Sequence, residues 1–299
     1  MATGKVLPPR PSIEMSLTRT ITVAQGPPAT ACELLAAAAG LPKGRIKDAM
    51  TKGAVWLRHG GKRRRLRRAT ALPAPGDVLE LFYDEELLVR EPPLPRCLAD
   101  ERHYTIWYKP PGLLAQGNDY GDHCSLLRQA ELHTRRPVFL VHRLDREAAG
   151  LMLVAHTREA AARLSRLFRE KRIDKLYRVR VRGRLPAPGG VIALPLDGKP
   201  ARTEYTVSRY DSATDTTLAE VRLASGRLHQ IRRHLALLGH PVMGDPRYGT
   251  GNKDAAGLQL LAAGLAFRCP FGGALSSYAL PEELLAEERS RQIVDSSNR

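Results

Sequence analysis

Three strand-like segments follow one another with no helix between them, and they constrain the fold more than any other feature. They read KLYRVRVRG (175–183), TEYTVSRY (203–210) and TTLAEVRL (216–223). Parallel strands need long, usually helical crossovers, so strands joined this directly are expected to pair antiparallel. Helices are expected near 125–132, at 158–171 and within 228–238. The predicted class is therefore α+β with a mixed, largely antiparallel sheet, rather than a doubly wound parallel sheet.

A proline-rich stretch divides the chain. Residues 90–101, REPPLPRCLADE, place three prolines in four positions and are typical of a linker. The predicted organisation is an N-terminal extension (1–29), a small domain (30–89), this linker (90–101), the α+β domain (102–285) and a flexible tail (286–299).

The charge of the chain points to a polyanionic partner. Forty-seven Lys and Arg against thirty-one Asp and Glu give a net charge of +16. Arginine pairs with phosphate in two-point geometry, so nucleic acid is favoured over a membrane surface, for which no basic amphipathic helix with bulky apolar residues is found. No apolar run is long enough to span a bilayer, and the N-terminus lacks a secretory signal. The four scattered cysteines fit reduced thiols in the cytoplasm and exclude a zinc ribbon.

The small domain carries much of this charge. Thr30, Glu33 and Gly40 predict a capped helix over TACELLAAAA, followed by a second helix, a strand, a basic turn and another strand. Its cations are expected to contact RNA: Lys43, Arg45, Lys47, Lys62, Arg63, Arg64 and Arg65. The order of elements resembles the alpha-L RNA-binding module of a ribosomal small-subunit protein and of several RNA-modifying enzymes. The alternatives are a solvated basic face and a nuclear-localisation cluster.

Asp145 is the strongest single candidate for a functional residue in the α+β domain. It lies in HRLDREAAG (142–150), between Arg143 and Arg146, just before the apolar run LMLVA. Gly150 permits a close backbone approach there. Burial without a partner would raise the pKa of this carboxyl, whereas a nearby arginine would keep it ionised as a nucleophile or general base. The alternative is a structural salt bridge that anchors a loop.

A second cluster lies in SGRLHQIRRHLALLGHPVMGDPRYG (225–249). The basic and amide side chains Arg227, His229, Gln230, Arg232 and Arg233 crowd the start of a helix whose apolar stripe, Leu228, Ile231, Leu235 and Leu238, is expected to dock on the sheet. Gln230 and Arg232 are expected to point into a cleft, and GHPVMGDPRYG to form a loop over a pocket. Three histidines here suggest a metal site, which is rejected because no acidic ligand falls on the same face.

Tyr177 opens the basic strand of the first segment. A tyrosine at such a position usually serves packing. Near a base-binding cleft its ring can stack on a nucleobase and its hydroxyl can move a proton.

These blocks together resemble the RluA family of RNA pseudouridine synthases over residues 100–280. The blocks are YKPPGLLAQG, HRLDREAAGLMLVA, KLYRVRVRG, GKPARTEYTV and GRLHQIRRHLALLGHPVMGDPRYG. The resemblance implies that Asp145 is the catalytic aspartate, that Tyr177 stacks on the uracil, and that Arg232 pairs with the aspartate. It also implies that Arg143 holds the place of the flipped-out nucleotide, with Arg146, Arg227, His229 and Gln230 as further RNA contacts. No metal or organic cofactor is implied.

The chain departs from the family pattern at two places. Ala148 and Ala149 stand where Thr-Ser is usual, and Ala262 stands where a histidine is usual. The expected function is isomerisation of uridine to pseudouridine by a cytoplasmic monomer, in ribosomal RNA first and transfer RNA as the alternative. The rival from another class is a non-catalytic RNA-binding or ribosome-assembly protein on the same fold. A metal-dependent nuclease is disfavoured because the acids are dispersed.

Overall fold

The computed structural model describes residues 16–223 and 225–293, which form two compact units. The first unit contains the described residues up to Pro92 and also Gly117–Cys124. The second contains Pro93–Gln116 and the described residues from Ser125 onward. The chain therefore passes between the units three times. Among the described residues, no helix is both long and apolar enough to cross a membrane.

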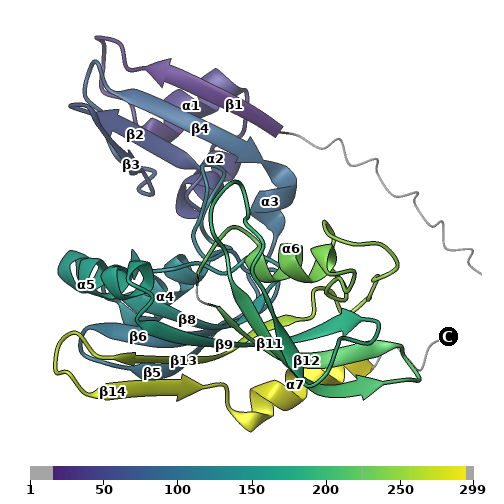
Figure 1. The fold of residues 1–299 in the computed structure, drawn as a ribbon. Coiled ribbons are helices and arrows are strands. Elements are labelled where there is room, and N and C mark those ends of the chain that lie inside the picture. Colours follow the sequence, from purple (N-terminus) through teal and green to yellow (C-terminus); the bar gives the residue numbers. More distant parts are fainter. Residues whose placement is uncertain (1–15, 224, 294–299) are drawn as a thin grey trace, which may run out of the picture. The chain divides into compact units, whose positions relative to one another are not determined.

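The first unit is a small antiparallel sheet packed against two helices (Figure 1). The strand order is β1-β4-β2-β3. The elements are β1 (Ser16–Thr22), α1 (Ala31–Ala39), α2 (Lys43–Thr51), β2 (Val55–His59), β3 (Lys62–Arg65), β4 (Val78–Asp84) and the short α3 (Glu85–Val89). Its core is formed by apolar side chains of the helices and of the inner strands, among them Leu35, Ile46 and Leu81.

The first helix of this unit begins and ends as predicted. The Thr30 hydroxyl accepts a hydrogen bond from the backbone N–H of Glu33, and the Glu33 carboxylate accepts one from the backbone N–H of Thr30. Gly40 ends the helix with a φ of 65°, a left-handed conformation that glycine adopts without strain.

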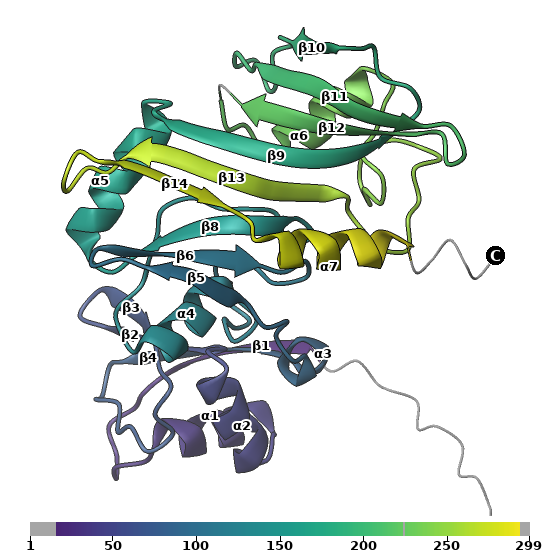
Figure 2. The ribbon, with the colours of Figure 1, turned by 90° about the horizontal axis from the view of Figure 1, so that it is seen from below.

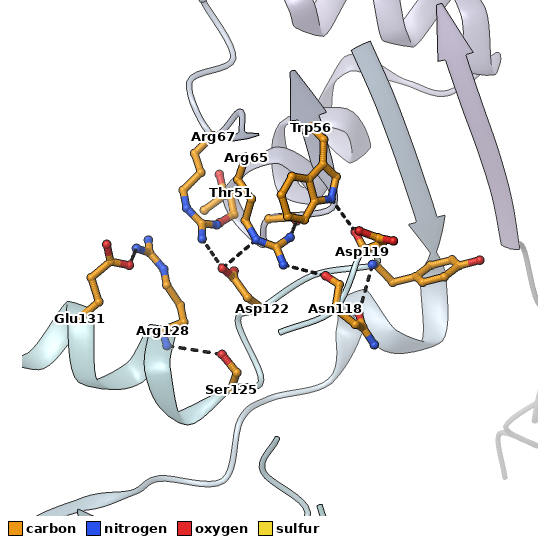
Figure 3. A network of polar contacts seen from close by, with 12 residues as sticks. Thr51, Trp56, Arg65, Arg67, Asn118, Asp119, Asp122, Ser125, Arg128 and Glu131 are labelled. Carbon is orange, nitrogen blue, oxygen red and sulfur yellow. Dashed lines mark hydrogen bonds and ion pairs between the residues drawn. The ribbon is translucent and has the colours of Figure 1, made fainter. Parts of the chain in front are cut away.

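Residues 117–124 are distant in sequence from the rest of the first unit and are held in it by arginines of the β3 region (Figure 3). Arg65 and Arg67 contact the same carboxylate oxygen of Asp122, at 3.1 and 2.5 Å. Arg65 Nη2 also donates to the carbonyl of Asn118 at 2.7 Å. The indole N–H of Trp56 donates to the carbonyl of Asp119 at 3.2 Å. Several cations of the basic turn therefore fix a loop of the protein itself.

The second unit is built on a ten-stranded sheet. Figure 2 shows the path β10-β11-β12-β9-β13-β8-β6-β5 and β14 beside β13. The short strand β7 pairs with β8. The strands are β5 (Arg96–Asp100), β6 (Tyr104–Lys109), β7 (Phe139–Leu140), β8 (Ala149–Ala155), β9 (Ile173–Arg182), β10 (Gly189–Ile192), β11 (Thr203–Asp211), β12 (Thr216–Leu223), β13 (Leu260–Arg268) and β14 (Leu275–Ala279). Within this sheet β8 and β13 pair parallel, while the other named pairs are antiparallel. The predicted mixed, largely antiparallel α+β fold is confirmed.

The described residues of the second unit also form four helices: α4 (Leu126–Thr134), α5 (Arg158–Arg169), α6 (Gln230–Leu237) and α7 (Glu282–Ile293). Apolar residues of α5 and α7 share a core with β6, β8 and β13, whereas α4 packs in a second core around Trp107. Ile231 and Leu235 of α6 pack against β9 and β12 in a third core. Leu228 and Leu238 are 62% and 40% exposed, so the predicted apolar stripe on this segment is limited to its two central members.

The structure also differs from the predicted domain boundaries. Strand β1 lies inside the expected N-terminal extension and pairs with β4 along its whole length. Strand β5 lies in the expected linker and pairs with β6. Helix α7 continues to Ile293, inside the expected tail, whose residues 294–299 lie outside the described part of the chain. Strand β1 and helix α7 are organised by partners that are distant in sequence, whereas β5 pairs with the strand that directly follows it.

Candidate active site

Asp145 lies in the loop between β7 and the fully buried strand β8. Gly150 fixes where this loop meets the sheet, because its φ is 120° and a Cβ atom there would lie 2.3 Å from the carbonyl oxygen of Ala262. Ala262 pairs with Gly150 at the parallel junction of β8 and β13. The close backbone approach predicted for Gly150 is therefore present, and Ala148 and Ala149 beside it are buried.

A buried lysine holds the same loop from the other side. Lys109, at the end of β6, donates to the carbonyls of Pro110 and Leu113 at 3.0 and 2.8 Å and to that of Arg146 at 3.3 Å. Gly112 and Arg146 also exchange hydrogen bonds in both directions. Lys109 was not predicted as a site residue, although a lysine that ends the apolar strand TIWYK is a signal that could have identified it.

Arg232 joins Asp145 to a second carboxylate. Its Nη1 donates to Asp145 at 2.8 Å, while Nε and Nη2 form a two-point contact with Asp245 at 2.7 and 2.8 Å. The side chains of Arg232 and Asp245 are 1% and 0% exposed. The predicted pairing of Asp145 with Arg232 is therefore present, but the sequence analysis missed Asp245, which anchors the arginine.

This buried network is charged. Burial alone would lower the pKa of Arg232, but the hydrogen bonds and charges of Asp245 and Asp145 raise it above the ordinary value. Burial alone would raise the pKa of Asp245, but Arg232 and the backbone N–H groups of Arg247 and Tyr248 lower it. Arg232 therefore presents a permanent positive charge to Asp145.

His229 contacts the other oxygen of Asp145. Its Nε2 lies 3.5 Å from Asp145 Oδ1, and its Nδ1 lies 2.9 Å from the hydroxyl of Tyr248. Burial lowers the pKa of His229, with Asp145 opposing that shift. His229 thus lies beside the carboxylate rather than on an open RNA-facing surface.

Tyr177 lines the same cavity from strand β9. Burial, with a smaller contribution from Asp145, raises the pKa of Tyr177 to about 12. Its hydroxyl therefore keeps its proton at neutral pH. Since β9 lies between β12 and β13, this residue lies within the sheet rather than at its edge.

Gln230 differs from the sequence-based expectation of an RNA contact. It is 3% exposed, and its amide oxygen accepts from Ser225 Oγ and from the backbone N–H of Arg227. Its amide nitrogen donates to Arg202 O and Thr203 Oγ1. With these bonds made inside the protein, Gln230 fixes the start of α6.

A cavity of about 660 Å³ contains these groups, which is within the size range of small-molecule sites. It brings together Arg143, Asp145, Tyr177, Arg227, His229, Gln230 and Arg232. Arg146 is exposed and does not line this cavity. A carboxylate that contacts a buried arginine in a cavity also lined by a tyrosine is suited to nucleophilic or acid–base chemistry on a ring-sized substrate.

The predicted RNA-binding cations of the first unit divide into two groups. Lys43, Arg45, Arg63 and Arg65 form ion pairs with carboxylates of the same unit. Lys47, Lys62 and Arg64 are exposed and form no ion pair among the described residues. Arg63 and Arg65 also stack over the Trp56 ring at 4.1 and 4.2 Å.

Comparison with known proteins places this site in a family. Residues 103–237 match the family described as RNA pseudouridylate synthase. The chain is 33% identical over 179 residues to the dual-specificity RNA pseudouridine synthase RluA of Escherichia coli (strain K12), covering 55% of this chain and 81% of that protein. It is 34% identical over 177 residues to the ribosomal large subunit pseudouridine synthase D of Nitrosomonas europaea, covering 53% of this chain but only 51% of that protein.

The fold has a counterpart among solved structures. Human RNA Pseudouridylate Synthase Domain Containing 1 superposes with a TM-score of 0.57 at 22% identity, covering 66% of this chain and 87% of that one. This similarity concerns the fold alone.

Proposed function

This chain belongs to the RluA family of RNA pseudouridine synthases, and on that premise we propose that it isomerises uridine to pseudouridine in ribosomal RNA. The single observation that carries the proposal is the contact between Asp145 and the buried Arg232, at 2.8 Å, inside a cavity that Tyr177 also lines. Transfer RNA is the alternative substrate class. The E. coli relative is named a dual-specificity enzyme, and the Nitrosomonas relative is named for the large ribosomal subunit.

In the proposed reaction, a carboxylate oxygen of Asp145 attacks C1′ of the ribose as the bond from C1′ to N1 breaks and uracil leaves with that electron pair. The uracil turns in the cavity, C5 bonds to C1′, and Asp145 departs. N1 gains a proton and C5 loses one, so that the net change is an isomerisation. Arg232 holds the Asp145 carboxylate in place through its contact at 2.8 Å, and the Tyr177 ring packs against the uracil. Attack on the base instead of the ribose is the other route by which Asp145 can release uracil.

The target uridine must leave its stack to reach this cavity, and RNA contacts elsewhere offset a few kcal/mol of unstacking. We propose that the first unit supplies part of that affinity, in the manner of the alpha-L modules it resembles. We further propose that the enzyme acts as a monomer in the cytoplasm, where its four cysteines stay reduced.

The decisive experiment is tritium release from RNA labelled at C5 of uridine. Total ribosomal RNA and total transfer RNA from cells lacking this protein are each incubated with the wild type and with Asp145→Asn. Release by the wild type alone supports the proposal, and the RNA that gives it identifies the substrate class. No release from either RNA by a folded, RNA-binding wild type would favour a non-catalytic RNA-binding protein.

A further inference from the structure

The cavity extends beyond the groups that the proposed reaction uses. Some of its lining residues, here termed the cationic arm, come from α5, from the turn after it, from β9 and from the loop before β8: Arg143, Phe168, Arg169, Lys171 and Lys175. Four of these five side chains are cations. Arg143, Arg169 and Lys171 are exposed at the rim, whereas Lys175 is half-buried.

These cations have no carboxylate partner in the part of the chain that the structure describes. None of the four forms an ion pair with a described residue. Among the described residues that line the cavity, Asp145 is the one carboxylate, and Arg232 already binds it. The cationic arm is therefore a concave surface of one sign, which attracts anions more strongly than the same charges on a convex face.

A structural role accounts for only part of this cluster. Arg169 lies in the last turn of α5 and Lys171 just beyond it, where cations stabilise the helix dipole. Lys175 lies on a strand, two residues before Tyr177, so that the two side chains point to the same face of β9. Burial lowers the pKa of Lys175, and no neighbouring carboxylate opposes that shift. A desolvated lysine without a counter-ion is costly unless a bound anion compensates it.

Two stacked rings, His142 and Phe168, line the cavity next in sequence to Arg143 and Arg169 of the cationic arm. The rings of His142 and Phe168 stack with centroids 4.4 Å apart. His142 Nε2 accepts the backbone N–H of Leu153 at 3.0 Å, and burial lowers the pKa of His142 to about 3. His142 is therefore neutral at physiological pH, so the positive charge of the arm comes from its lysines and arginines.

We propose that the cationic arm binds a backbone phosphate of the RNA next to the target uridine, with Lys175 as its principal ligand. The assignment rests on the proposed function, because it takes the base to lie at Tyr177. Two strand residues rise roughly 6.6 Å, so a single nucleotide with its base at Tyr177 has a phosphate within reach of Lys175. The arm would then fix the orientation of the ribose toward Asp145.

The test compares the binding of uridine, uridine 5′-monophosphate and uridine 3′-monophosphate to the full chain by NMR titration, with inorganic phosphate as competitor. We expect at least one nucleotide to bind about tenfold more tightly than uridine, since a charge-assisted hydrogen bond of this kind is worth about a factor of ten. Lys175→Gln should abolish this advantage, and Lys175→Arg should retain most of it. The matched control Arg209→Gln removes one exposed charge from β11, outside the cavity, and should change nothing.

A second variant keeps the test valid if Lys175→Gln fails to fold. Arg169→Gln combined with Lys171→Gln alters only exposed side chains and should reduce the advantage several-fold. Equal binding of uridine and both nucleotides, no binding of either nucleotide at millimolar concentration, or an unchanged advantage in Lys175→Gln would overturn the phosphate site. Because none of these probes is turned over, a failure of tritium release with the nucleotide advantage intact would overturn the proposed function and leave the phosphate site standing.

Discussion

Arg232 and Arg233 are adjacent on α6, yet their ion pairs lie in different surroundings. Arg232 binds Asp145 and Asp245 with 1% of its side chain exposed, whereas Arg233 binds Asp197, whose side chain is 67% exposed. Removing one partner of a buried pair leaves an uncompensated charge, but an exposed pair is replaced by water at little cost. The two arginines therefore provide a matched comparison.

Asp245→Asn is expected to lower the free energy of unfolding by about 3 kcal/mol and to reduce turnover at least tenfold, because Arg232 loses the carboxylate that orients it. Denaturant unfolding and tritium release measure the two effects. Asp197→Asn is the control and should resemble the wild type in both assays. Equal behaviour of the two variants would show that Asp245 does not position Arg232.

The same carboxylate predicts a pH dependence. The folded-state pKa of Asp245 lies below its ordinary value of 3.8, so its contribution to stability is present at neutral pH and is lost as the pH falls through the folded-state pKa. The stability difference between the wild type and Asp245→Asn should be constant from about pH 8 to about pH 5 and shrink below about pH 4. Urea unfolding over this range measures it. A difference that stays constant at low pH would argue against the ionised pair.

At the scale of elements, the sequence predicted those that local patterns specify. The capping residues around α1, the apolar run of β8 and the three successive strands β9, β11 and β12 all lie where expected. Strands β1, β5, β10 and β14 were missed because each is short or polar and acquires its structure from a partner strand. Within the site, the contact of Asp145 with Arg232 was predicted, but Asp245 was not, since no local pattern marks a turn residue as the anchor of an arginine thirteen positions earlier.

The junction of β8 and β13 depends on one glycine. Gly150→Ala would place a Cβ 2.3 Å from Ala262 O at a φ of 120°, so it should lower the free energy of unfolding by at least about 3 kcal/mol. Gly198→Ala is the control, because Gly198 has a φ of 69° but nothing within 4 Å, and should cost only about 1 kcal/mol. Thermal unfolding separates the two. Similar losses in the free energy of unfolding would mean that glycine is required at position 150 because of backbone strain, and not because of the contact with Ala262.

The two cations of β3 that form no ion pair among the described residues, Lys62 and Arg64, should contribute to RNA affinity. Neutralising Lys62 and Arg64 together to Gln should weaken RNA binding and reduce the slope of log affinity against log salt by about 1.4 to 1.8, if each contacts one phosphate. Filter binding of total ribosomal RNA to an Asp145→Asn background measures this without turnover. Neutralising Lys253 and Arg209 together, two exposed cations of the second unit, removes the same net charge and is the control. An unchanged slope would remove these two cations from the RNA-binding surface.

At the scale of the whole molecule, the two units are not two consecutive stretches of chain. Residues 117–124 follow β6 in sequence but belong to the first unit, where Gly53 leaves room for them: a Cβ at Gly53 would lie 2.5 Å from Asp122 Oδ1. The segment GNDYGDHC contains no local pattern that predicts its placement in the first unit, because the arginines that bind it lie more than fifty residues earlier.

This arrangement predicts where a fragment lacking residues 1–92 becomes sensitive to proteolysis. Tyr120 packs edge-on against Phe82 at 5.6 Å in the full chain, and the fragment removes both Phe82 and the arginines. Chymotrypsin should cleave after Tyr120 much faster in the fragment than in the full chain, as followed by mass spectrometry. Tyr120→Ala in the fragment is the control that identifies the site. Equal rates would show that residues 117–124 hold their conformation without the first unit.

The three passages of the chain between the two units also limit how this protein can be recombined with others. Suppose that residues 16–92 were exchanged for another domain. Residues 117–124 would then lose the space that Gly53 leaves for Asp122, and they would lose their contacts with Arg65 and Arg67. A functional chimera therefore requires that two segments be exchanged together, the one up to residue 92 and residues 117–124. The first unit is therefore compact in space but is encoded by two separate stretches of the gene.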